Sequence, residues 1–307
     1  MDFTLRQLVI FLKVVEFQSV TRAAEALYLS QPAVSIQSRK FQEQFDIPLT
    51  EVVGRQLYVS DFGKEIARSA EKILAEVDAV NYKTKAFQGE LAGRLKLSIV
   101  STAKYVMPYF LSDFMARHPA VDLVMDVTNK QRVVSSLERN EVDFSLVSVL
   151  PAQLTLNRVE LMRNKLYLVG GSDPSRNPKT SARKILAGHP LLYREKGSAT
   201  RVAMERFLTE KQLPTFKKIE LTSNEALKQA IVAGLGYSIM PLIGIKNELK
   251  NEDLTIIKMK GLPIITHWNL VWLKSKRLSP VAEAYLNFIR EEKARIIAEK
   301  FAWFEDY

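Results

Sequence analysis

Groups that can bind small anions recur beyond residue 100, each at the expected start of a helix. Hydroxyls and free backbone N–H groups at such positions attract carboxylates and phosphates, although each one alone also fits an ordinary helix cap. Four such segments that follow strands of a two-lobed α/β fold predict one cleft for an acidic small molecule. The predicted binding residues are Ser101, Thr102, Asn129, Lys130, Gln131, Ser198, Thr200, Arg201, Thr222, Ser223 and Asn224.

Groups suited to catalysis or to metal binding do not form a comparable pattern. The chain has no cysteine, and His118, His189 and His267 are far apart and lack the spacing of a metal site. Gly234 and Gly236 follow an expected helix rather than a strand, so they do not form a dinucleotide-binding turn. The sequence therefore predicts no enzyme, no metal site and no cofactor.

A second polar group lies in residues 19–40, which read as two short helices joined by a tight turn. Ser30 is a good N-cap, and Pro32 is tolerated in the first turn of the second helix. We expect the buried side to hold Ala33, Val34, Ile36 and Phe41, and the outer side to hold Gln31, Ser35, Gln37, Ser38, Arg39 and Lys40. Such a helix can read a DNA major groove, but an ordinary helical hairpin with a polar face fits equally well.

Three further elements are expected around this hairpin. Apolar residues at helical steps predict a helix after Thr4, and residues 49–60 predict a small β-hairpin with Arg55 near its tip. Residues 61–88 predict one long helix. Its apolar residues recur at a mean spacing near 3.5, which favours a coiled-coil seam with a second copy over packing on its own domain. The seam residues are Phe62, Ile66, Ala70, Ile73, Val77, Val80 and Phe87.

Beyond a flexible joint at 89–94, strands and helices alternate, which predicts a sheet rich in parallel strands with helices on both faces. The rhythm repeats after residue 166, so residues 95–300 are expected to form two similar α/β lobes. Expected strands are 95–100, 123–127, 144–147, 166–169, 217–221, 237–240 and 268–273; expected helices are 108–117, 131–139, 181–187, 200–211, 224–233 and 279–300.

Charge and composition indicate which partners and which cellular compartment to expect. The 307 residues have a net charge of +10, yet residues 1–60 hold six basic and six acidic residues, so the excess charge lies downstream. It can attract DNA non-specifically or favour an anionic ligand in the later domain. The lack of cysteine, of a signal peptide pattern and of an apolar run long enough to cross a bilayer predicts a cytoplasmic protein without a membrane partner.

Taken together, these segments resemble the LysR-type transcriptional regulators over nearly the whole chain. The resemblance rests on LRQLVIFLKVVEFQSVTRAAEALYLSQPAVSIQSRKFQEQF and PLTEVVGRQLYVSDFGK near the start. Beyond residue 120 it rests on VDLVMDVTNKQRVVSSLERNEVDFSLVS, LLYREKGSATRVAMERFL and LTSNEALKQAIVAGLGYSIMP. The last two segments are similar to regulators of carbon-fixation and sulfur-assimilation operons. Thr50, Val59, Ser60 and Ala199 depart from the family's usual residues.

The resemblance implies a winged helix-turn-helix DNA-binding domain (1–60), a linker helix that dimerises (61–90) and a two-lobed effector domain shaped like a periplasmic binding protein (91–307). It implies that Gln31, Pro32 and Ser35 face bases, that Ser30, Ser38, Arg39 and Lys40 contact phosphates, and that Arg55 enters the minor groove. Expected partners are promoter DNA, an anionic effector, further copies of the chain and RNA polymerase. The alternative is a small-molecule-binding protein whose N-terminal module contacts another protein.

Overall fold

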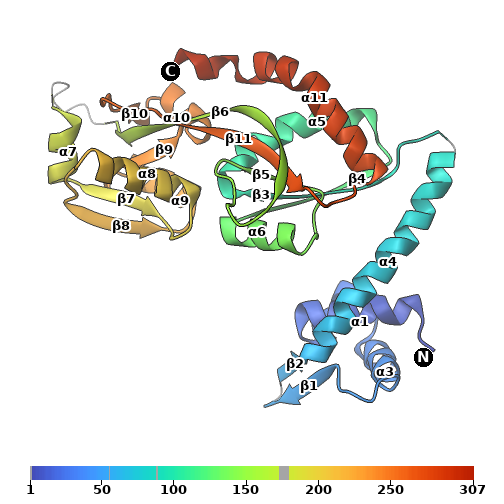
Figure 1. Ribbon diagram of the computed structural model, residues 1–307. Helices are drawn as coiled ribbons and strands as arrows, with labels where there is room; N and C mark the ends of the chain where they lie inside the picture. The colour runs from blue at the N-terminus through green and yellow to red at the C-terminus, as the bar shows by residue number, and fades with distance from the viewer. Residues whose placement is uncertain (1, 55, 88, 173–179) are drawn as a thin grey trace. The chain divides into compact units, whose positions relative to one another are not determined.

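The computed structural model describes residues 2–54, 56–87, 89–172 and 180–307, and divides the chain into two compact units, 1–90 and 91–307 (Figure 1). Unit 1 is a helical head, and its elements are α1 (Leu5–Phe17), α2 (Val20–Ala26), α3 (Gln31–Gln42), β1 (Thr50–Val53), β2 (Gln56–Val59) and α4 (Asp61–Phe87). A capping box between Thr4 and Gln7 starts α1. β1 and β2 pair antiparallel, as the predicted wing requires.

Aromatic rings hold the head together. Phe41 from α3 is fully buried and packs against Phe11 from α1, with ring centroids 5.0 Å apart. The first half of α4 joins the same cluster through Ala67 and Ala70. The first part of α4 is therefore packed in the core of the head, and the helix continues beyond this core to Phe87.

Unit 2 is an α/β domain of two lobes. The first half of its chain forms β3 (Gly93–Val100), η1 (Ser101–Tyr105), α5 (Met107–Arg117), β4 (Val121–Thr128), α6 (Lys130–Glu138), β5 (Phe144–Val147) and β6 (Leu156–Gly171). The second half begins with α7 (Ala182–Gly188), β7 (Pro190–Arg194), α8 (Ala199–Glu210), β8 (Lys217–Leu221) and α9 (Asn224–Val232). It ends with β9 (Ser238–Pro241), η2 (Leu242–Gly244), α10 (Lys246–Lys250), β10 (Leu254–Ile256), β11 (Ile264–Leu273), α11 (Pro280–Phe301) and η3 (Ala302–Asp306).

The main sheet has the order β10-β6-β11-β5-β3-β4, with β9 also paired to β6. β3 pairs parallel with β4 and β5, whereas β6 and β11 pair antiparallel with each other and run through both lobes (Figure 1). The expectation of a sheet rich in parallel strands therefore holds for the first lobe and for the β7-β8 pair, but it is wrong for the strands that join the lobes. β6 is also far longer than the predicted 166–169, because its charged first half hides the strand pattern.

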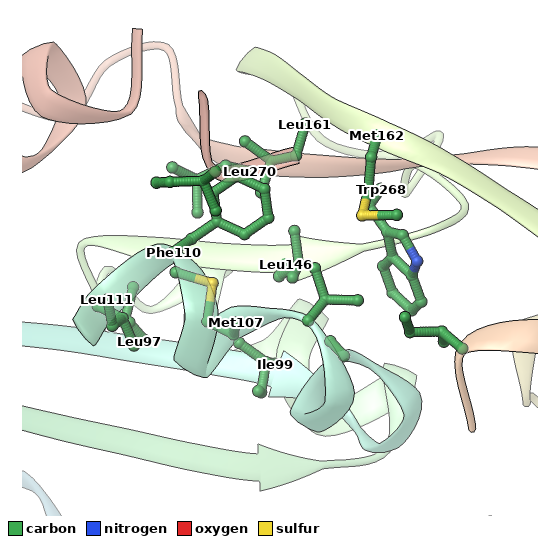
Figure 2. Close-up of a cluster of buried hydrophobic side chains, with 14 of the residues drawn as sticks. Leu97, Ile99, Met107, Phe110, Leu111, Leu146, Leu161, Met162, Trp268 and Leu270 are labelled. Carbon is green, nitrogen blue, oxygen red and sulfur yellow. The ribbon is translucent and has the colours of Figure 1, made fainter. Parts of the chain in front are cut away.

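The sheet of the first lobe is covered on both faces. α5 and α11 cover one face and α6 covers the other (Figure 1). Alternation along β5 explains this: Phe144 and Leu146 join the α5–α11 core, and Val147 joins the α6 cluster. Figure 2 shows Leu97, Ile99, Met107 and Phe110 packed with Leu146 and Trp268 in the larger core.

The C-terminal residues cap the same domain. Phe301 and Phe304 are buried, and the Lys165 ammonium on β6 donates hydrogen bonds to the Phe304 carbonyl (2.8 Å) and to Glu305 (3.1 Å). Phe301 and Phe304 therefore complete the core of unit 2, and the hydrogen bonds from Lys165 hold the tail against β6.

Candidate nucleic-acid interface and ligand cleft

The helix-turn-helix is built by local caps. The Ser19 hydroxyl accepts a hydrogen bond from the Arg22 N–H at the start of α2, and Tyr28 adopts a left-handed φ of 55° in the turn. Ser30 precedes α3 as its N-cap but makes no side-chain capping bond. Its exposed hydroxyl is therefore available to an outside partner, such as a phosphate.

One face of α3 is buried and another is open. Val34 and Phe41 are buried seven residues apart, while Gln31, Pro32 and Ser35 are exposed. The prediction that Ile36 is buried is wrong, since its side chain is 54% exposed. Ile36 lies two residues after Val34, which turns it about 200° around a helix with 3.6 residues per turn.

The residues predicted to contact phosphates differ in their exposure and in their interactions. Lys40 and Arg39 are exposed, and the Arg39 guanidinium forms an i,i+4 ion pair with Glu43 at 3.0 Å. Ser38 is half-buried because it lies one turn after Val34, and its hydroxyl has no hydrogen-bond partner within the described residues. Arg55 lies outside the described residues.

The apolar residues of α4 serve two purposes rather than one. Phe62, Ile66 and Ala70 belong to the core cluster of the head, so the first part of the predicted seam packs on its own domain. Further along, Ile73 is 39% exposed and Val80 is 61% exposed. Among the described side chains of the predicted seam, Ile73 is thus exposed toward solvent rather than packed in the core of the head.

A small pocket lies between the two lobes of unit 2. Its volume is about 30 Å³, which corresponds to about one water molecule. Six of the eleven predicted binding residues line it: Ser101, Thr102, Asn129, Lys130, Ser198 and Thr200. Its other lining residues are Val100, Thr128, Ser148, Arg194, Glu195 and Ala199. The pocket thus gathers three of the four predicted segments in one place.

The helix starts around the pocket differ in their caps. Asn129 caps α6 through the Arg132 N–H at 2.9 Å, and Ser223 caps α9 through the Ala226 N–H at 3.0 Å. Ser198 is the N-cap of α8 yet makes no side-chain capping bond. The start of α8 therefore keeps unused donors that face the pocket.

Arg194 is the most buried charged group of the pocket lining, with 5% of its surface exposed. It ends β7, and its Nε and Nη2 atoms donate to the two carboxylate oxygens of Glu195, each at 2.8 Å. Its Nη1 atom donates to the side-chain oxygen of Asn224. The Asn224 amide in turn donates to the Thr102 hydroxyl at 2.7 Å, so Asn224 links the two lobes behind the pocket.

The remaining predicted residues do not line this pocket. Arg201 is buried, and its guanidinium binds Glu205, Glu220 and the Arg194 carbonyl. Burial lowers the pKa of Arg201, but its hydrogen bonds to Glu220 and Glu205 outweigh that effect and leave the pKa above its ordinary value. Gln131 and Thr222 are exposed at helix starts, and Ser223 and Asn224 hold α9 and the lobes in place.

Sequence reasoning missed Arg194, Glu195 and Ser148. Arg194 was overlooked because strand β7 was not predicted, although Leu191, Leu192 and Tyr193 form a short apolar run before the Gly197 turn. The rule that ligands bind at the carboxyl ends of strands would have identified Arg194 once that strand was recognised.

No group of three or more metal-binding side chains occurs in the part of the chain that the structure describes. Within the same ranges, no helix is both long and apolar enough to span a bilayer.

Comparison with known families identifies the protein family to which these two units belong. Residues 5–64 match the family described as bacterial regulatory helix-turn-helix protein, lysR family, and residues 88–294 match the LysR substrate binding domain. The chain belongs to the LysR family. The predicted winged helix-turn-helix head and two-lobed domain are those of this family, which confirms the fold class.

LysR-family relatives match over almost the full chain. The RuBisCO operon transcriptional regulator of Allochromatium vinosum is 35% identical, over 96% of this chain and 98% of the relative. The transcriptional activator CmpR of Synechocystis sp. is 32% identical, over 97% of this chain and 99% of the relative. These relatives are transcriptional regulators and not enzymes, and the first agrees with the predicted resemblance to carbon-fixation regulators.

Solved LysR structures agree with the fold. The regulatory domain of Synechocystis CcmR, in complex with 2-PG, is 30% identical and matches with a TM-score of 0.60, over 64% of this chain and 95% of that chain. Full-length CbnR complexed with its target DNA matches with a TM-score of 0.71 over 94% of this chain and 99% of that chain. At 18% identity, the second likeness shows the fold alone. The chain is thus a DNA-binding transcriptional regulator with an effector-binding domain.

Proposed function

We propose that the pocket between the lobes of unit 2 binds a small anionic metabolite that controls this regulator. The observation that carries the proposal is the convergence of Arg194, Lys130 and the uncapped start of α8 on one pocket. Cations and free N–H donors around a cleft favour carboxylates and phosphates. The 2-PG complex of the CcmR regulatory domain supports the same class of ligand.

On the DNA side, α3 is the proposed recognition helix. Gln31, Pro32 and Ser35, which are exposed on one side of α3, read base edges in the major groove. Ser30, Ser38, Arg39 and Lys40 contact phosphates, and Arg55 enters the minor groove. The target promoter belongs to a carbon-fixation operon, as the regulators of RuBisCO operons among the relatives suggest.

The metabolite then controls the regulator through a rigid-body movement of the two lobes. Binding moves the lobes against each other about β6 and β11, which changes how dimers joined through α4 pair into a tetramer. The DNA-binding heads change their spacing along the promoter, where RNA polymerase is the further partner. This activity belongs in the cytoplasm, where a bacterial promoter is found.

Binding of the full chain to the DNA upstream of its own gene tests the proposal. Gln31→Ala should weaken binding to that DNA by about 1–3 kcal/mol, the value of one base contact, while binding to unrelated DNA stays the same. Gln37→Ala is the matched control, because Gln37 is the same residue type on the same helix but half-buried on another side. Equal effects of both substitutions would contradict the role of Gln31.

The same binding assay, repeated with 2-PG, tests the ligand class. We expect 2-PG to shift the DNA affinity or the length of protected DNA, and Lys130→Met to weaken that response without changing DNA binding in its absence. A protein that ignores 2-PG, inorganic phosphate and organic acids, but responds to a neutral metabolite, would overturn the anionic assignment.

A further inference from the structure

The buried arginine of the pocket is already occupied by a carboxylate of the chain itself. Glu195 presents both of its oxygens to the Nε and Nη2 atoms of Arg194 at 2.8 Å. This two-point contact is the geometry in which arginine binds a carboxylate or a phosphate of a ligand. The two donors that would recognise an anionic effector are therefore both engaged by the Glu195 carboxylate.

The backbone after β7 makes this contact between sequence neighbours possible. Neighbouring residues of a regular strand point to opposite faces, but the strand ends at Arg194. The chain then turns, with the Ser198 N–H donating to the Glu195 carbonyl at 3.2 Å and with Gly197 at a φ of +89°. This turn brings the Glu195 carboxylate back over Arg194.

The charges around the pocket are consistent with Glu195 taking the place of an anionic ligand. Its lining includes two cations, Lys130 and Arg194, and Glu195 is the one acidic residue among the lining residues that the structure describes. The remaining space of about 30 Å³ is too small for a metabolite. The Glu195 side chain is 23% exposed, so a change of rotamer can carry its carboxylate toward solvent.

We propose that Glu195 is a built-in competitor of the anionic effector: it neutralises Arg194 in the empty pocket and is displaced when the effector's anionic group binds those two donors. This inference rests on the proposed function of the pocket. Because every anion must displace the Glu195 carboxylate before it can bind Arg194, Glu195 lowers the affinity of the pocket for anions. Ligands with two oxygens that replace both hydrogen bonds are favoured over the others. The displacement of Glu195 also links binding of the effector to the conformation of the turn at 195–198, and hence to the start of α8.

Glu195→Gln tests the proposal in the full chain, with inorganic phosphate as the probe. Removing the competing charge should tighten phosphate binding by about tenfold in calorimetry, equivalent to about 1.4 kcal/mol. Glu210→Gln is the matched control, because it removes the same charge from an exposed position at the far end of α8. Glu195→Ala should change phosphate affinity in the same direction and serves if the glutamine variant does not fold.

Thermal unfolding adds a readout that a merely structural glutamate would not give. Without Glu195, the buried Arg194 is left uncompensated, so Glu195→Gln should lower Tm, and phosphate should raise Tm more in this variant than in the wild type. If the wild type binds phosphate and Glu195→Gln binds it equally or more weakly, the competitor role is overturned and the anion site stands. If neither protein binds phosphate, the anion site itself falls, and this inference with it.

Discussion

At the scale of single residues, the cleft depends on side chains that touch both lobes. Asn224 receives a hydrogen bond from Arg194 and gives one to Thr102, and Tyr105 donates from η1 to Glu225 on α9 at 3.2 Å. Lys228, buried one turn further along α9, pairs with Glu225 at 3.1 Å and with Glu248 at 2.6 Å. These contacts hold the lobes together beside the pocket.

Glu225 gives this contact a defined pH dependence. Partial burial raises the pKa of Glu225, but hydrogen bonds from Lys228, Gln229 and Tyr105 outweigh it and leave the pKa below its ordinary value. A lowered pKa contributes stability above about pH 4.3, the unfolded value, and that stability is lost as the pH falls through the folded value. We therefore expect Glu225→Gln to destabilise unit 2 by about 0.5–1 kcal/mol at pH 7.

Urea unfolding at pH 7 and at pH 3.5 measures this effect. The difference between wild type and Glu225→Gln should shrink at the lower pH, because the Glu225 carboxylate of the unfolded chain then takes up a proton. Glu291→Gln, an exposed substitution on α11, provides the control and should leave the midpoint unchanged at both values. A difference of the same size at both values of pH would contradict the ionic role of Glu225.

At the scale of elements, the junction between the wing and α4 shows how the chain accommodates its departures from the family pattern. Ser60 stands where the family usually has threonine, and its hydroxyl donates to the Pro48 carbonyl at 2.6 Å and accepts from the Gly63 N–H at 2.9 Å. Ser60 therefore caps α4 and also fixes the end of the wing. The first turn of α4 lies against the backbone of Leu49 as a result.

Gly63 is required by this close approach. A Cβ atom at position 63 would lie 2.0 Å from the Leu49 carbonyl oxygen, so the backbone would have to move. We expect Gly63→Ala to destabilise the head by about 1–3 kcal/mol, although alanine normally favours a helix. Thermal unfolding followed by circular dichroism checks this.

Ser69→Ala is the control for the glycine substitution. Ser69 is exposed on the same helix, so its replacement by alanine should keep or slightly raise the stability of the head. Equal stability of both variants would show that the approach of Leu49 to α4 is not a constraint.

At the scale of the whole molecule, α4 is the element through which we propose that two copies join. Its first half is buried in the head, and Ile73 and Val80 are exposed further along. Ile73→Glu should place a charge in the proposed seam and shift the protein from dimer toward monomer in analytical ultracentrifugation. Ala75→Glu, with the same added charge two residues away and facing outward, should stay dimeric. Dissociation by both substitutions, or by neither, would argue against this seam.

The sequence by itself determined the family and most of the order of the elements, and it predicts α3 as the recognition helix. These follow from local signals: apolar periodicity, the Ser30 and Pro32 start of α3, and strand–helix alternation, each of which acts within a few residues of the chain. Six residues that line the pocket between the lobes were also within reach, because helix starts after strands are visible in the sequence. The expectation that Ile36 is buried was wrong, since helical periodicity turns Ile36 about 200° away from the buried Val34.

Only the tertiary structure decided which polar groups meet. Arg201 was predicted at the cleft, yet it lies buried among Glu205, Glu220 and the Arg194 carbonyl, while Arg194, from an unpredicted strand, lines the pocket. The antiparallel course of β6 and β11 likewise depends on pairing between segments about 100 residues apart. Such contacts are set by packing across the fold, where the burial of one charge depends on partners far away in the sequence, and local pattern carries no information about them.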